Sequence, residues 1–179
     1  ITTNDNEIYK KLRTLTWLGV EKSTYERAEK KKYTWDYDIT QSQGIKAYMT
    51  DTQAVVGLGQ LRRLKKTNKR RRDIQVMYNK AFKNMPEIEL PKYSHTVQYY
   101  TMKCENRNEL SEYLAENDIA TSVHFKPLSE MTYWKKAVKR PIPVTDKVWL
   151  KLLSLPVHNA LTNKEVQFII KKVKKFYEK

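Results

Sequence analysis

A lysine and a tyrosine precede a strong helix start in the first third of the chain. Thr50 and Gln53 have the spacing of a capping box, so a helix is expected to begin there. Lys46 and Tyr48 lie in the short loop directly before it. A helix start exposes unpaired N–H groups and the positive end of the helix dipole, and a nearby cation adds to that field. The pattern therefore predicts a phosphate site beside Lys46.

Periodic patterns predict an N-terminal helical part. Asn4 with Glu7 indicates a helix start, and Gly19 indicates that helix's end. Residues 21–43 have no sustained period and are expected to form a long loop. A further helix is predicted over about 65–83, after the one that starts at Thr50.

The C-terminal part changes to alternating strand and helix patterns. β-branched and aromatic runs indicate strands, and polar caps before apolar periods indicate helices. Strands and helices in this order predict a small sheet covered by helices. The predicted strands are 96–102, 119–125 and 154–157, and the predicted caps are Asn106, Thr145 and Thr162, the last in a capping box with Glu165.

The chain is strongly basic. Its 179 residues fit one domain, or one domain and a remnant of another, and they carry 35 Lys and Arg against 20 Asp and Glu. The formal charge of +15 fits a solvated surface, a phosphorylated substrate or nucleic acid. The densest basic cluster is 65–72, which a basic nucleic-acid-binding module would use as its patch. No RNP-like, KH-like, helix-turn-helix or zinc signature accompanies it.

Two features of the sequence limit where the protein can act and which chemistry it can perform: it has one cysteine, and it has no long apolar run. Cys104 cannot form an internal disulfide and has no metal-ligand spacing around it, so no metal site is predicted. No apolar run approaches the roughly 20 residues of a membrane span, and the N-terminus does not read as a secretory signal. A cytoplasmic protein without a membrane partner is expected.

Six segments carry motifs in a fixed order along nearly the whole chain. They are 1–5, 12–20, 44–61, 69–74, 119–128 and 153–162. Residues 44–61 follow Gly-Tyr-(Asn or Lys)-x-x-Met-(Ser, Asn or Thr)-Asp-x-Gln-Ala-x-x-Gly-x-x-Gln-Leu, with Ile45 in place of the Tyr. Together these segments resemble the DegT/DnrJ/EryC1/StrS family of pyridoxal-phosphate-dependent sugar aminotransferases.

The resemblance implies an α/β fold, with an α+β arrangement in this chain. Residues 1–64 would be a remnant of the large cofactor-binding domain, like that of aspartate aminotransferase, including an interface loop. Residues 65–179 would be the small C-terminal domain with its linking helix. The resemblance also implies a homodimer that uses pyridoxal phosphate to transfer an amino group, typically from glutamate, to a nucleotide-linked keto sugar. The sugar is not identified.

The family's covalently binding lysine precedes the segment that 1–5 resembles. No residue of this chain is therefore expected to be catalytic, and the chain is expected to be the C-terminal part of such an enzyme and inactive alone. Besides the nucleic-acid-binding module, a non-catalytic dimerisation fragment remains an alternative.

The resemblance assigns roles to four residues. Lys46 would contact the cofactor phosphate of the neighbouring subunit, where the family has Asn or Lys. Tyr48, His124 and Phe125 would contact substrate, although Tyr48 stands where relatives often have Arg, His or Asn, and Phe125 replaces the usual Tyr. The alternatives are an ordinary loop lysine at 46 and a structural histidine at 124.

Overall fold

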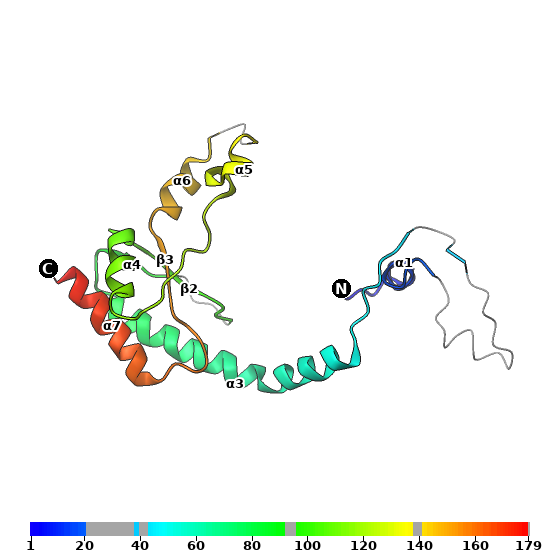
Figure 1. Ribbon diagram of the computed structural model, residues 1–179. Coiled ribbons are helices and arrows are strands. Elements are labelled where there is room, and N and C mark those ends of the chain that lie inside the picture. The colour runs from blue at the N-terminus through cyan, green and yellow to red at the C-terminus, as the bar shows by residue number, and fades with distance from the viewer. Residues whose placement is uncertain (21–37, 40–42, 92–95, 138–140, 179) are drawn as a thin grey trace. The chain divides into compact units, whose positions relative to one another are not determined.

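The computed structural model describes residues 1–20, 38–39, 43–91, 96–137 and 141–178 (Figure 1). The chain forms two compact units, Ile1–Gln60 and Leu61–Lys179. Most of the loop predicted for 21–43 lies outside the described residues. Among the described residues, no helix combines the length and apolar character needed to cross a bilayer.

The first unit begins with α1 (Asn6–Thr16). The predicted cap at Asn4 is wrong by one residue, because the Asp5 carboxylate accepts the backbone N–H groups of Glu7 and Ile8 at 2.8 and 3.0 Å. An acidic cap also suits the positive end of the helix dipole. Gly19, predicted as the C-cap of this helix, lies two residues beyond the observed C-cap, Trp17; it has a φ of 85° and donates its N–H to the Thr14 carbonyl at 2.9 Å. A glycine adopts this left-handed backbone without steric cost.

The capping box at Thr50 is confirmed and starts α3 (Asp51–Phe82). The Thr50 N–H donates to Gln53 Oε1 at 2.9 Å, and the Gln53 N–H donates to Thr50 Oγ1 at 3.3 Å. The two helices predicted at Thr50 and over 65–83 are one continuous helix. Residues 62–66 are Arg, Arg, Leu, Lys and Lys, which are good helix formers and give the helix no reason to end.

The second unit contains a three-stranded antiparallel sheet in the order β1-β2-β3. Its strands are β1 (Ile88–Glu89), β2 (Tyr100–Cys104) and β3 (Leu152–Leu155). The predicted strand at 119–125 is wrong: Ser122 forms one isolated bridge with Ser154, and no strand continues from it. β-branched and aromatic residues favour extended backbone, but a strand also needs a partner along its length.

Five helical segments accompany the sheet. Asn106 is the N-cap of its helix, as predicted, but it has a φ of 49° and makes no side-chain capping hydrogen bond. The cap predicted at Thr145 is wrong, because the helix begins earlier, at Pro143, which suits a first helical turn. The Thr162–Glu165 capping box is confirmed. The segments are α4 (Arg107–Ala115), η1 (Leu128–Glu130), α5 (Thr132–Lys135), α6 (Pro143–Trp149) and α7 (Asn163–Tyr177).

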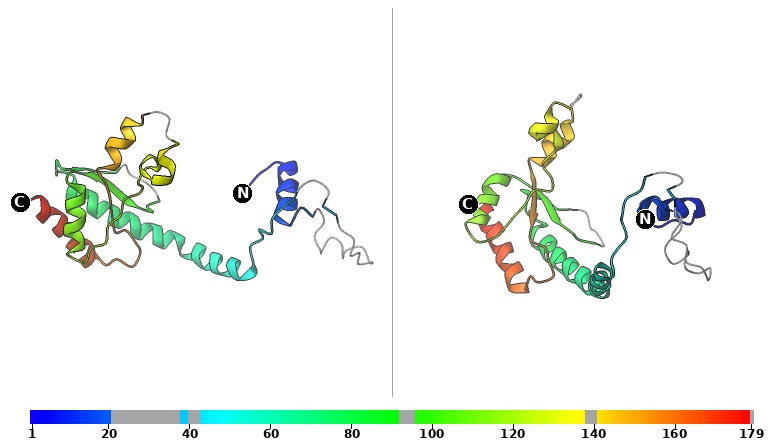
Figure 2. Two further views of the ribbon diagram at one scale, coloured as in Figure 1. Left: turned by 45° about the horizontal axis from the view of Figure 1, so that its top comes forward. Right: turned by 45° about the vertical axis from the view of Figure 1, so that its right-hand side comes forward.

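The core of the second unit lies on one face of this sheet. Tyr100, Met102 and Cys104 alternate inward along β2, while Thr101 and Lys103 face the other way. Tyr78 of α3 packs on Tyr100 with ring centroids 4.8 Å apart. Figure 2 shows α3 and α7 side by side below the sheet. Buried apolar residues from α4 and α7 complete the core: Leu110, Leu114, Val166, Ile169, Ile170 and Val173.

Truncation of Leu114 tests this core. Leu114 is fully buried, so Leu114→Ala removes apolar contacts and leaves a cavity. We expect it to lower the free energy of unfolding by about 2–5 kcal/mol in urea titrations followed by circular dichroism. Leu150→Ala is the matched control, because Leu150 is 54% exposed and should change that free energy by less than about 0.5 kcal/mol. Equal effects of the two variants would contradict the assigned core.

Candidate functional site

Lys46 lies in an extended segment that pairs with the end of α1. The Ile45 N–H donates to the Leu15 carbonyl at 2.8 Å, and the Ala47 N–H donates to the Thr16 carbonyl at 3.0 Å. Gly44 permits this close approach, since a Cβ there would lie 2.4 Å from both the Gly19 nitrogen and the Leu15 oxygen. The backbone around Lys46 is thereby held to α1 although the side chain is exposed.

Two aromatic rings and two cations form a stack beside this segment. The Lys46 ammonium lies 5.5 Å from the centroid of the Trp17 ring. Trp17 stacks on Tyr48 at 5.0 Å with an interplanar angle of 14°, and the Arg13 guanidinium lies 5.0 Å from the Tyr48 ring. Cations over aromatic faces are attracted by the ring quadrupole, by about 0.5–1 kcal/mol at exposed sites. We call Arg13, Tyr48, Trp17 and Lys46 the cation–aromatic stack.

The positive charge offered to an anion comes from Lys46 more than from the helix start. The backbone N–H of Gln53 already donates to Thr50 in the capping box, and Asp51 places a carboxylate in the first turn of α3. That carboxylate takes up part of the positive end of the helix dipole. An exposed ammonium held over an indole ring remains a compact point charge, which suits a phosphate oxygen.

His124 lies on the sheet face opposite the core. Its Nδ1 is 2.9 Å from Ser154 Oγ, and Ser154 Oγ is 2.7 Å from Thr101 Oγ1. The imidazole stacks on the Tyr99 ring with centroids 3.8 Å apart and an interplanar angle of 22°. One ring nitrogen and one ring face are therefore occupied within the protein, and the side chain remains only partly buried.

Phe125 completes an aromatic surface around His124. It meets the His124 ring edge to face at 4.9 Å and the Tyr99 ring at 6.2 Å. Phe125 is 68% exposed and Tyr99 is 44% exposed. We call Tyr99, His124 and Phe125 the imidazole platform. It combines apolar ring surface with one available imidazole nitrogen, which suits a flat or ring-shaped ligand that carries polar edges.

The structure brings the four predicted residues together in pairs. Lys46 and Tyr48 belong to the cation–aromatic stack in the first unit, and His124 and Phe125 belong to the imidazole platform in the second. Sequence reasoning missed Trp17, Ser154 and Tyr99. No motif spacing links these residues to Lys46 or His124, and only the pairing of distant segments places them there.

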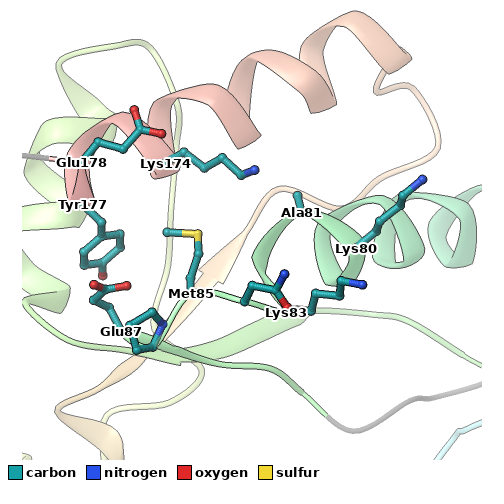
Figure 3. Close-up of a pocket in the computed structure, with 10 residues that line it drawn as sticks. Lys80, Ala81, Lys83, Met85, Glu87, Lys174, Tyr177 and Glu178 are labelled. Atoms are coloured by element: carbon teal, nitrogen blue, oxygen red, sulfur yellow. The ribbon is translucent and has the colours of Figure 1, made fainter.

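The second unit also has a cavity of about 390 Å³ between the C-terminal ends of α3 and α7 (Figure 3). Lys80, Lys83 and Lys174 line it, but so do Glu87 and Glu178. Both helices direct the negative ends of their dipoles here, and lysines in last turns offset that charge. The cavity therefore has no net preference for an anion, and we assign it no ligand.

The basic cluster at 65–72 is largely engaged in contacts within the protein. Arg70 Nε donates to the Leu161 carbonyl at 3.1 Å, and Arg70 also donates to Asn163 Oδ1 at 2.7 Å. Arg71 donates to the Val97 carbonyl at 3.4 Å, and Lys69 pairs with Asp73 at 2.9 Å. The Arg70 contacts tie α3 to the start of α7. Together with the contacts of Lys69 and Arg71, they argue against an uncommitted nucleic-acid patch.

Cys104 is a core residue rather than a nucleophile. It is 1% exposed, and its thiol lies 3.6 Å from the Lys151 carbonyl. Burial raises the pKa of the Cys104 thiol from 9.0 to about 11. Because the thiolate is the reactive form, this environment suppresses nucleophilic chemistry near neutral pH.

The chain matches known sugar aminotransferases over nearly its full length. The sequence model of the DegT/DnrJ/EryC1/StrS aminotransferase family matches residues 1–174. Spore coat polysaccharide biosynthesis protein SpsC of Bacillus subtilis is 30% identical, over 97% of this chain and 48% of SpsC. The dTDP-3-amino-3,6-dideoxy-alpha-D-galactopyranose transaminase of Aneurinibacillus thermoaerophilus is 26% identical, over 98% of this chain and 46% of that enzyme.

A solved structure agrees with this match. Spr1654 of Streptococcus pneumoniae, in its PMP form, superposes with a TM-score of 0.82 at 30% identity, covering 98% of this chain and 46% of Spr1654. The similarity confirms the expected fold class, a mixed helical chain with a small antiparallel sheet that corresponds to part of a pyridoxal-phosphate aminotransferase fold. The chain spans about half the length of the curated relatives it matches.

Substitution of Gly44 tests how Lys46 is held. Gly44→Ala places a methyl group against Gly19 and Leu15, so we expect the segment to separate from α1 and Lys46 to leave the Trp17 ring. The measurement is the upfield ring-current shift of the Lys46 ε-methylene protons, which should largely disappear. Gly57→Ala is the control: its Cβ meets nothing within 4 Å, so it should keep the shift and stabilise α3 by about 1 kcal/mol.

A second prediction concerns the reactivity of the Cys104 thiol, whose pKa is raised by burial. The rise of about two units, from 9.0 to about 11, leaves about a hundredfold less thiolate at pH 8 in the folded chain. Iodoacetamide should therefore modify this single cysteine far more slowly in the native chain than in urea. The pKa of Cys104 is higher in the folded chain than in the unfolded chain, so the protonated thiol favours folding. This contribution to the free energy of unfolding is complete below pH 9 and is lost as the pH rises toward 11. Equal labelling rates in the two states would refute the buried assignment.

Proposed function

Because this chain belongs to the DegT/DnrJ/EryC1/StrS aminotransferase family, we propose that it forms the C-terminal part of an aminotransferase for a nucleotide-linked keto sugar. The observation that carries this proposal is the family match over residues 1–174. The family's aminotransferases use pyridoxal phosphate, which supplies the electron sink through which an amino group is exchanged. Glutamate is the proposed amino donor, and the chain alone is proposed to be inactive.

The cation–aromatic stack supports a role for Lys46 at the cofactor phosphate. The Lys46 ammonium is exposed, and its backbone is paired with the end of α1. The Trp17 ring beneath the ammonium limits the directions that the side chain samples. A lysine restricted in this way loses less conformational entropy when it meets a phosphate. The residues present therefore fit the phosphate end of the cofactor, with Lys46 as its cation, and Tyr48, stacked on Trp17, is proposed to contact substrate.

The imidazole platform supports a role in substrate binding. The exposed Phe125 and Tyr99 rings offer apolar surface on which the C–H face of a sugar ring can pack. His124 adds a nitrogen that can meet a sugar or phosphate oxygen. Phe125 lacks the hydroxyl that relatives place there, so its contribution is packing alone. The names of relatives, which include dTDP- and UDP-sugar transaminases, agree with a nucleotide-linked substrate.

The exposed apolar residues at the start of α3 support assembly with further polypeptide. Val55, Val56 and Leu58 are 68%, 59% and 54% exposed. Clustered apolar side chains on one helix turn are costly in water and mark a surface made for contact. We propose that this surface is covered in a homodimer whose active sites combine residues of both subunits.

The decisive experiment assembles this chain with the polypeptide encoded directly upstream of Ile1. Binding of pyridoxamine 5′-phosphate should be measured by calorimetry, because this probe has no aldehyde that would react with lysines at random. We expect the assembled protein to bind it, and Lys46→Gln to weaken binding at least tenfold, the effect of losing one charge-assisted hydrogen bond.

Two controls separate the cofactor role from general effects of charge. Lys10→Gln removes another exposed lysine, whose partner is Glu7, and should leave the affinity unchanged. Pyridoxamine without its phosphate should bind equally to the wild type and to Lys46→Gln. An assembled protein that binds the probe equally with and without Lys46 would overturn the cofactor role. An upstream reading frame without a cofactor-binding lysine would overturn the aminotransferase function.

A further inference from the structure

The hydroxyl chain behind His124 is set by the pairing of β2 with β3. Thr101 and Ser154 are directly opposite each other in this antiparallel pair, which brings their hydroxyl oxygens to 2.7 Å. On the other side of β3, Ser122 and Ser154 exchange backbone hydrogen bonds of 3.2 and 2.7 Å. His124 follows Ser122 by two residues, and this bridge places its Nδ1 at 2.9 Å from Ser154 Oγ.

Three proton arrangements fit these distances. In one, Thr101 and Nδ1–H both donate to Ser154, which leaves the hydrogen of the Ser154 hydroxyl, 5% exposed, without an acceptor among the described residues. The other two give the Ser154 hydroxyl an acceptor. In the first, Thr101 donates to Ser154, Ser154 donates to Nδ1, and the imidazole carries its proton on Nε2. In the second, Nδ1–H donates to Ser154, Ser154 donates to Thr101, and Nε2 is an acceptor. The second arrangement leaves the half-buried Thr101 hydroxyl with no acceptor among the residues that the structure describes. A half-buried donor without a partner is unfavourable, so the first arrangement is preferred.

We propose that Ser154, whose hydroxyl accepts from Thr101, is a positioning residue that holds His124 in its Nε2–H tautomer. His124 then presents a hydrogen-bond donor at the imidazole platform, and the stacked Tyr99 ring keeps the imidazole plane in place. Ser154 is 5% exposed, so its hydroxyl is available to His124 and Thr101 rather than to ligand. The serine and the threonine act through the histidine and do not touch substrate themselves.

The consequence for recognition rests on the proposed function. An N–H donor selects an acceptor oxygen, such as a hydroxyl, carbonyl or phosphate oxygen, and it disfavours an ammonium group at the same position. The platform would therefore accept an oxygen of the nucleotide sugar beside the exposed Phe125 ring. A histidine free to change its tautomer would lose that discrimination.

Imidazole nitrogen chemical shifts test the tautomer directly. Long-range ¹H–¹⁵N spectra of the full chain, recorded without ligand, distinguish a protonated ring nitrogen from an unprotonated one. We expect Nε2 of His124 to be protonated in the wild type. Ser154→Ala removes the hydroxyl that donates to Nδ1, so the share of the Nδ1–H tautomer should rise about fivefold, the factor for one ordinary hydrogen bond.

The matched control is Thr121→Val. Thr121 forms a hydroxyl pair with Ser111, also at 2.7 Å, but this pair has no contact with His124. The variant should leave the His124 shifts unchanged. A wild-type spectrum with the proton on Nδ1, or equal shifts in Ser154→Ala and Thr121→Val, would overturn the inference.

Ligand titrations keep this outcome separate from that of the proposed function. Adding dTDP-glucose to the wild-type chain assembled with the upstream polypeptide should move the His124 signals, and adding dTDP alone shows whether the acceptor belongs to the diphosphate or to the sugar. If the His124 chemical shifts do not change with either ligand, the role of His124 in substrate binding is overturned. The ligand-free spectra would still decide the tautomer.

Discussion

The pairing of Thr101 with Ser154 fixes the register of β2 against β3, and the second unit depends on that register. Side chains alternate across a strand, so the same register that sends Tyr100 and Met102 into the core sends Thr101 to the opposite face. A slip by one residue would exchange the two faces, burying hydroxyls in the core and exposing its aromatic residues. Core stability and the position of His124 are therefore two results of one constraint.

The two candidate binding clusters share a design in which the group that can meet a ligand is held by contacts with its neighbours. The Lys46 ammonium lies over Trp17, which in turn stacks on Tyr48. His124 is held by Ser154 at its edge and by Tyr99 on its face. In both clusters the group available to a ligand has restricted orientation before any ligand arrives, which lowers the entropy lost on binding.

Sequence patterns predicted the local features of this chain well and its pairings poorly. The capping boxes at Thr50 and Thr162 involve residues three apart, so spacing alone reveals them. The segment 119–125 has strand composition, yet only Ser122 finds a partner on β3. Lys46, Tyr48, His124 and Phe125 were identified by resemblance to family motifs. Their neighbours Trp17, Tyr99 and Ser154 were not identified.

The sequence by itself determined the family, the fold class and the helix starts marked by a capping box, at Thr50 and Thr162, because these depend on residue order and on contacts within one helical turn. Tertiary structure decided which groups surround Lys46 and His124. Trp17 reaches Lys46 only because Gly44 lets two backbones approach closely, and Ser154 reaches His124 only through the order of strands in the sheet. Hydrogen bonds and ring stacking act over a few ångströms, and distances that short between remote residues exist only in the folded chain.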